Sequence, residues 1–159
     1  MKLKIIVISG SYSNIGKTTL AKNIIKNLEP KRIEFIKFGH HPSNPAKKTK
    51  LFNDINEGLN YINLDNISKN FDYLIIESNS ILKFIEPDLA IFIFQDKKPQ
   101  KDSAAFAMQK ADIIIDQNFN TLSKSKKFKK FVFEKLGDDN IMSALFDQYQ
   151  FLYEFRKEQ

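Results

Sequence analysis

The hydrophobic positions of this chain fall into short uninterrupted runs that alternate with longer amphipathic segments. Short runs rich in Ile, Leu and Phe are typical of strands that are covered on both faces of a sheet. Segments with apolar residues at helical spacing follow several of these runs. The alternation predicts an α/β fold with a mainly parallel sheet of five or six strands and helices on both faces.

The boundaries of the predicted elements follow from these runs. The predicted strands cover residues 4–9, 33–38, 73–76, 89–94 and 112–115, with a further short one at 131–133. The predicted helices cover residues 17–28, part of 50–59, 102–110 and a C-terminal segment from about residue 140. The last helix has an apolar stripe that predicts core packing, with docking on a second subunit as the alternative. The stripe consists of Met142, Leu145, Phe146, Tyr149, Leu152 and Tyr153.

The segment between the first predicted strand and the first predicted helix carries the residues of a phosphate site. Gly16 lets the backbone approach a phosphate closely, and the following helix directs N–H groups toward an anion. Lys17 would place an ammonium against the outer phosphates, and the Thr18 hydroxyl is a hard oxygen ligand suited to Mg²⁺. The Walker A spacing is met only with Ser11 in place of the first Gly, because Gly10 stands one residue too early. The sequence thus predicts a nucleotide-binding protein.

Composition and charge narrow the class of protein. At 159 residues the chain is expected to form one domain, residues 1–159, and its lack of Cys excludes disulfides and thiol catalysis. The first apolar run ends at Ser9 and is therefore too short to span a bilayer, so we expect a cytoplasmic protein without membrane contact. The net charge of +6 comes from 25 Lys and Arg against 19 Asp and Glu. We interpret the Lys-rich stretches at residues 46–50, 97–101 and 124–130 as solvated loops, and nucleic acid is not an expected partner.

Read from Gly10, the loop GSYSNIGKT resembles the phosphate loop of dethiobiotin synthetase and its P-loop relatives. The form of that loop is G-T-x-T-x-V-G-K-[ST], in which Ser11 and Ser13 take the Thr places and Ile15 takes the Val place. The resemblance implies a P-loop NTPase fold that binds GTP or ATP with Mg²⁺. The residues that it implies in nucleotide binding are Gly10, Ser11, Ser13, Asn14, Ile15, Gly16, Lys17, Thr18 and Thr19.

Lys37 lies near the end of the second predicted strand and is followed closely by His40 and His41. This pattern is similar to that of a second P-loop family, the molybdopterin-guanine dinucleotide biosynthesis protein B (MobB) family. Lys37 also resembles the lysine with which dethiobiotin synthetase helps to bind its substrate. We expect Lys37 and His40 to contact substrate or phosphate, with a surface cation and a plain loop His as the alternatives. Asn118, just after the strand predicted at 112–115, is a candidate for contact with the nucleotide base, and GTP and ATP are both left open.

Glu77 directly follows the strand predicted at residues 73–76. Both families carry a strand-end Glu followed by Gly, so the resemblance implies that Glu77 is the Walker B carboxylate that holds Mg²⁺ or its water. An ordinary strand-end acid is the alternative, and Ser78 replaces the Gly. Lys48 stands where a MobB-like loop has an acidic residue, which leaves Asp54 as a substitute ligand. The expected metal ligands are therefore Thr18, Glu77 and Asp54.

Two functions follow from the resemblance. The first is an accessory protein that binds a magnesium nucleoside triphosphate and hydrolyses it slowly in molybdenum-cofactor or related cofactor maturation, with Lys17 and Glu77 as the catalytic residues. This function implies a partner protein of the cofactor pathway, and a homodimer by analogy. The second is an ATP-dependent ligase or kinase like dethiobiotin synthetase, which transfers the terminal phosphoryl group to a bound acceptor. A kinase or switch of another P-loop family is a third reading.

Overall fold

The computed structural model describes residues 2–39, 49–62, 64–96, 102–116, 121–123, 132, 134–137 and 140–148 of the chain. Its strands are β1 (Lys4–Gly10), β2 (Ile33–Phe38), β3 (Thr49–Phe52), β4 (Tyr73–Glu77), β5 (Leu89–Phe94), β6 (Ile113–Asp116) and β7 (Thr121–Ser123). Its helices are α1 (Lys17–Leu28), α2 (Ile55–Tyr61), α3 (Leu64–Asn70), the 3₁₀ turn η1 (Ser80–Lys83), α4 (Asp102–Lys110) and α6 (Ile141–Gln148).

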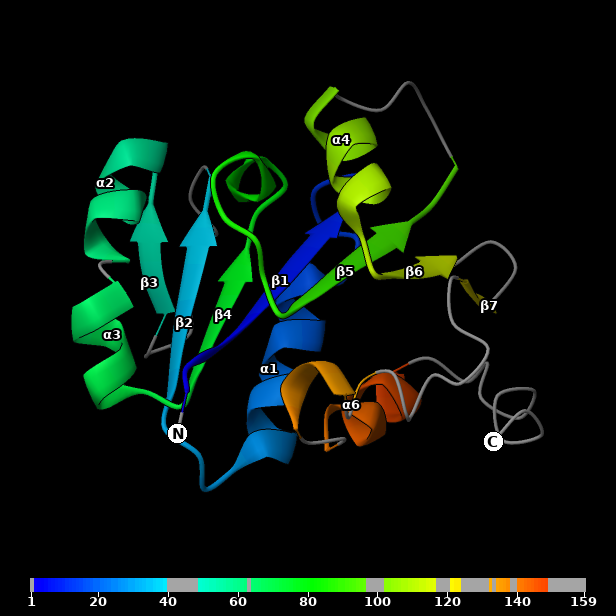
Figure 1. Cartoon of the computed structure of the whole chain (residues 1–159). Helices are drawn as coiled ribbons and strands as arrows, with labels where there is room; N and C mark the ends of the chain where they lie inside the picture. Colours follow the sequence, from blue (N-terminus) through cyan, green and yellow to red (C-terminus); the bar gives the residue numbers. More distant parts are fainter. Residues whose placement is uncertain are drawn as a thin grey trace.

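One sheet organises these elements (Figure 1). Its strand order is β3-β2-β4-β1-β5-β6-β7. The first six strands in this order run parallel, and β7 pairs antiparallel with β6 at one edge. The α/β fold with a mainly parallel sheet is confirmed: among the described residues six strands are parallel, and the short antiparallel strand β7, which was not predicted, makes a seventh.

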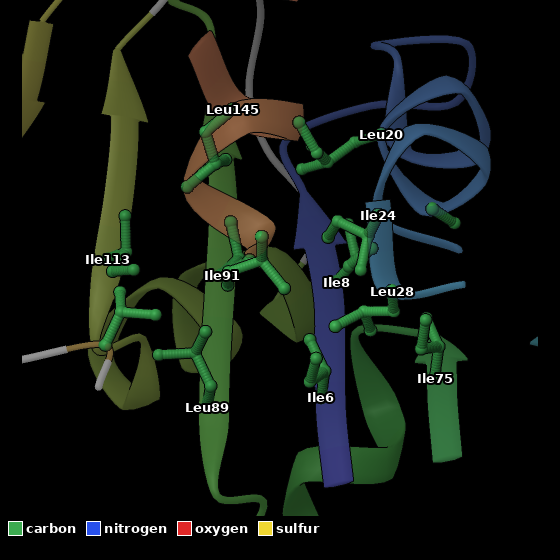
Figure 2. Close-up of a cluster of buried hydrophobic side chains, with 14 of the residues drawn as sticks. Ile6, Ile8, Leu20, Ile24, Leu28, Ile75, Leu89, Ile91, Ile113 and Leu145 are labelled. Atoms are coloured by element: carbon green, nitrogen blue, oxygen red, sulfur yellow. The ribbon is translucent and has the colours of Figure 1, made fainter. Parts of the chain in front are cut away.

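An apolar cluster covers each face of the sheet, and successive side chains of the central strand β1 point alternately into the two clusters. Ile6 and Ile8 of β1 point to a cluster that includes α1 and α6, which lie next to each other in Figure 1. Figure 2 shows this cluster, with Ile24 of α1 and Leu145 of α6 packed over the strands. Val7 points to the opposite cluster, to which α3 and α4 contribute. The side chains named here are all apolar and fully buried, and burial of such groups is the main favourable contribution to folding.

Several predicted boundaries are confirmed and others are corrected. The strands at residues 33–38 and 89–94 and the helices at 17–28 and 102–110 have the predicted limits. The helix predicted within 50–59 is wrong at its start, since Thr49–Phe52 pairs with β2 as strand β3 and α2 begins only at Ile55. The strand predicted at 131–133 is wrong at Val132, which is helical, while residues 131 and 133 lie outside the described part.

The C-terminal helix packs on the core in the part that the structure describes. Ile141, Ala144 and Leu145 are fully buried in the cluster that contains α1. The side chains of Met142 and Phe146 and all of residues 149–153 lie outside the described part. Within the described residues, no helix is long and apolar enough to cross a membrane.

An ion pair joins the starts of β2 and β4. Arg32 Nη2 donates to Asp72 Oδ1 over 2.9 Å, and the Arg32 backbone N–H donates to Asp72 Oδ2 over 2.9 Å. The side-chain hydrogen bond, followed by the backbone one, lowers the pKa of Asp72 from 3.8 to about 2. The charged carboxylate is therefore favoured in the folded state, so its contribution is present above pH 3.8 and is lost as the pH falls toward 2.

We predict that Asp72→Asn lowers the urea midpoint of unfolding at neutral pH and flattens its decline between pH 3.8 and about 2. The physical reason is that Asn keeps an acceptor for the Arg32 N–H but has no proton to gain in this range. The midpoint measured as a function of pH checks this, with Glu86→Gln, an exposed acid elsewhere, as the control. An unchanged slope in Asp72→Asn and in the control alike would contradict the assigned role.

Candidate functional site

The loop between β1 and α1, residues 11–16, contains two residues with a left-handed backbone. Asn14 and Gly16 adopt left-handed conformations, with φ values of 61° and 109°. Gly16 is also the N-cap of α1, whose first residue is Lys17. Left-handed residues in such a loop let successive N–H groups turn to the same side, and the helix N-terminus adds its partial positive charge. This β1–α1 loop is therefore suited to hold phosphate oxygens.

Gly10 fixes where the β1–α1 loop starts. A Cβ at this position would lie 2.8 Å from Ile15 Cγ2 and 3.2 Å from the Ile93 carbonyl oxygen, too close for any side chain. Asn79 clamps the same residue from the end of β4, accepting from the Gly10 N–H and donating to the Gly10 carbonyl, each over 3.0 Å. The loop is thus held against both neighbouring strands of β1.

Lys17 folds back over the β1–α1 loop. Its Nζ donates to the carbonyl oxygen of Tyr12 over 2.8 Å. This contact keeps the ammonium above the loop, where it can meet an anion held by the loop N–H groups. A lysine in that position acts as a compact point charge on phosphate.

Three polar side chains meet beside the start of α1. Thr18 Oγ1 donates to Glu77 Oε2 over 2.6 Å, and Lys37 Nζ lies 3.1 Å from both Thr18 Oγ1 and Glu77 Oε1. The sheet register explains the meeting, because Lys37 on β2 and Glu77 on β4 are directly paired positions. Paired positions of neighbouring strands project to the same face, and α1 covers that face. The Glu77 side chain is only 5% exposed, so the Lys37 ammonium balances its charge and the Thr18 hydroxyl supplies a hydrogen bond in place of water.

Two hollows share this centre. The smaller, about 240 Å³, is lined by Asn14, Gly16, Lys17, Thr18, Thr19, Lys37 and Glu77. The larger, about 530 Å³, is lined by Gly10, Ser11, Tyr12, Ser13, Lys17, Phe38, Gly39, Asn53, Ile55, Glu77, Ser78, Asn79, Ser80 and Ser103. Lys17 and Glu77 line both, so a ligand in either hollow reaches the same pair of opposite charges.

Most of the residues predicted for the site are brought together in these hollows. The Ile15 side chain is instead buried in the apolar cluster that contains α1. Asp54 lines neither hollow; its Oδ1 accepts from the N–H groups of Asn56 and Glu57 as the N-cap of α2. His40 and Asn118 lie outside the described residues.

Ser78, which follows Glu77, joins the end of β4 to the strand beside it and to η1. Ser78 N–H donates to the Ile8 carbonyl oxygen, and Ser78 Oγ accepts from the Ile81 N–H at the start of η1. Sequence reasoning missed Asn79 and the side chains from Asn53 and Ser103. Asn79 had a usable signal, since polar residues directly after neighbouring parallel strands gather at one edge of the sheet.

The donor set suits a small divalent cation. Within the described part of the chain, no cluster of three or more His, Asp and Glu is arranged around a metal position. Thr18 Oγ1 and the Glu77 carboxylate nevertheless supply two hard oxygens. The positive ammonium of Lys37 already contacts both of these side chains, which shows that the position accepts a cationic group. Mg²⁺ takes few protein ligands and completes its shell with water and phosphate oxygens, so two protein oxygens fit it.

Comparison with known proteins adds no assignment. A scan against protein-family models, a search of curated proteins and a search of solved structures found no match for this chain. Its function is therefore inferred from the side chains and backbone of the site itself.

We predict that Asn79→Ala destabilises the fold by about 1–3 kcal/mol, because the Gly10 N–H and carbonyl both lose a partner. Chemical denaturation checks this value. Asn70→Ala, which removes a single exposed hydrogen bond within α3, is the matched control and should change stability much less. Equal losses in the two variants would show that the clamp on Gly10 contributes nothing special.

Proposed function

We propose that this chain binds a nucleoside triphosphate, GTP or ATP, as its magnesium complex. The observation that carries the proposal is the convergence of Lys17 and Thr18 of α1 with Glu77 of β4 beside a loop with two left-handed residues. Backbone N–H groups, an ammonium, a hydroxyl and a carboxylate are the groups that a metal-bound polyphosphate requires.

The phosphates are proposed to lie along the β1–α1 loop. There the N–H groups of the loop and of the first turn of α1 donate to the phosphate oxygens, and Lys17 exchanges the Tyr12 carbonyl for them. Thr18 and Glu77 would hold Mg²⁺, and Glu77 would bind either the ion itself or one of its waters. A bound Mg²⁺ would offset charge on the outer phosphates. Asp54 is left out of this ligand set because its carboxylate caps α2.

Slow hydrolysis fits this arrangement better than rapid turnover. A general base must be free to take a proton from the attacking water. Glu77 accepts from Thr18 and pairs with Lys37 in the ligand-free protein, and it would hold Mg²⁺ or one of its waters in the loaded one, so its carboxylate is engaged in both states. This favours an accessory protein that binds and slowly hydrolyses the triphosphate, while a role in molybdenum-cofactor or related maturation rests on the resemblance of Lys37 and the following His residues to MobB.

One observation favours the alternative, an ATP-dependent ligase or kinase. The larger hollow extends from Lys17 and Glu77 past Asn79 and Ser80 to Ser103, and at about 530 Å³ it has room for a small acceptor. An acceptor there would lie beside the terminal phosphate of a triphosphate held by the loop. The two functions differ in one property: a transferase turns over faster when its acceptor is supplied, and an accessory protein does not.

We predict that Lys17→Ala weakens binding of GTP and ATP analogues by about tenfold or more, because a charge-assisted contact to phosphate is lost. Isothermal titration calorimetry with each analogue and Mg²⁺ checks this. Lys22→Ala removes an equal charge from an exposed position of the same helix and should bind as the wild type does. Binding that survives Lys17→Ala unchanged would remove the main support for the proposal.

We predict that Glu77→Gln reduces magnesium-dependent hydrolysis by about tenfold and affects triphosphate affinity much less, since the carboxylate acts on the metal and not on the phosphates. Phosphate release at saturating nucleotide, measured beside the calorimetric affinity, separates the two effects. Wild-type turnover in the variant would mean that Glu77 has no part in holding the metal.

A further inference from the structure

The Lys37 ammonium contacts both side chains that the proposed function assigns to Mg²⁺. Its Nζ atom is 3.1 Å from Thr18 Oγ1 and 3.1 Å from Glu77 Oε1. The Lys37 side chain is 19% exposed and that of Glu77 is 5% exposed, so solvent screens the pair little. An ammonium and a divalent cation therefore compete for one small group of oxygens.

We propose that Lys37 is an internal counter-ion that occupies the magnesium position in the nucleotide-free protein, so that Mg²⁺ binds only together with a triphosphate. This inference rests on the proposed function, because it concerns the order in which the metal and nucleotide bind at the same site. Lys37 is a positioning residue in this scheme, acting through Thr18 and Glu77.

The charges around the smaller hollow support this dependence. Its charged lining residues are Lys17, Lys37 and Glu77, which together leave one net positive charge. A bare divalent cation would raise the local charge to three and would displace an ammonium that has no other anion among these lining residues. A triphosphate brings several negative charges along the β1–α1 loop, so the displaced ammonium gains a new partner when metal and nucleotide arrive together.

Glu77 gains from the same arrangement in the absence of ligand. Removing the partner of a buried carboxylate is costly, because the remaining charge is neither solvated nor balanced. Lys37 prevents this cost by holding Glu77 and Thr18 in the geometry that the metal later uses. The site is thereby preorganised without a metal, and binding of free Mg²⁺ is suppressed.

Metal binding without nucleotide tests the proposal directly. Mn²⁺ serves as the probe, because the electron paramagnetic resonance signal of the free ion reports how much is bound. The proteins compared are the wild type, Lys37→Gln and Lys22→Gln. Gln at position 37 keeps N–H donors for Thr18 and Glu77 while removing the charge, and position 22 is an exposed lysine of α1 that serves as the control.

We expect Lys37→Gln to bind Mn²⁺ about tenfold or more tightly than the wild type, with Lys22→Gln unchanged, a factor typical of coupling between linked sites. Adding Glu77→Gln to Lys37→Gln should abolish this gain. If Lys37→Gln is poorly folded, Lys37→Met is measured in its place, with circular dichroism confirming the fold. Equal Mn²⁺ affinity in wild type and folded Lys37 variants would overturn the proposal.

A titration of the wild type with a GTP or ATP analogue keeps this failure separate from that of the proposed function. Triphosphate binding with no gain in Mn²⁺ affinity would overturn the role of Lys37 alone. A wild type that binds neither triphosphate would instead remove the proposed function, on which the inference rests.

Discussion

The site depends on a central strand that is covered on both faces. Strand β1 lies between β4 and β5, and its side chains enter an apolar cluster on each side of the sheet. Because its neighbours run parallel to it, the carboxyl ends of all three strands meet at one edge, and the polar residues that follow them are brought together there. Burial of α1 on one face then fixes the helix start directly behind the end of β1. The packing of the core, more than any contact within the site, determines where the loop and its partners lie.

Charge is the second constraint, and the register of the sheet imposes it. Pairing of β2 with β4 sets Lys37 directly across from Glu77, and the packing of α1 brings Thr18 against the same carboxylate. A carboxylate with so little solvent exposure needs such partners, since an unbalanced buried charge is strongly destabilising. Under the proposed function, the same contacts would link stability to ligand binding, because a cation entering the site would have to replace the ammonium and an anion would offer it another partner.

Sequence reasoning was reliable where a pattern is local and failed where pairing at a distance decides. The apolar run of residues 33–38 and the helical spacing of 17–28 fix their elements by themselves, and the structure has both limits as predicted. Thr49–Phe52 is too short for its sequence pattern to predict a strand. It forms one because it pairs with the edge of β2. In the site, the clustering of Lys17 and Thr18 with Glu77 could be predicted, because the first two belong to the GKT motif and Glu77 ends a neighbouring parallel strand. The strand-end position of Asn79 was a usable signal for a place at this edge, but its pairing with Gly10 and the contact of Lys37 with Glu77 depend on strand order and register, which a single sequence does not reveal.

The central claim is that phosphate is held by the β1–α1 loop and the first turn of α1. The most direct measurement is a ¹H–¹⁵N correlation spectrum of the labelled protein, titrated with a non-hydrolysable GTP or ATP analogue and Mg²⁺. The account predicts that the largest amide shifts fall on residues 11–19, with smaller ones near the ends of β2 and β4, and that they saturate with one nucleotide. Shifts that are absent, or that concentrate elsewhere while residues 11–19 stay unmoved, would contradict it.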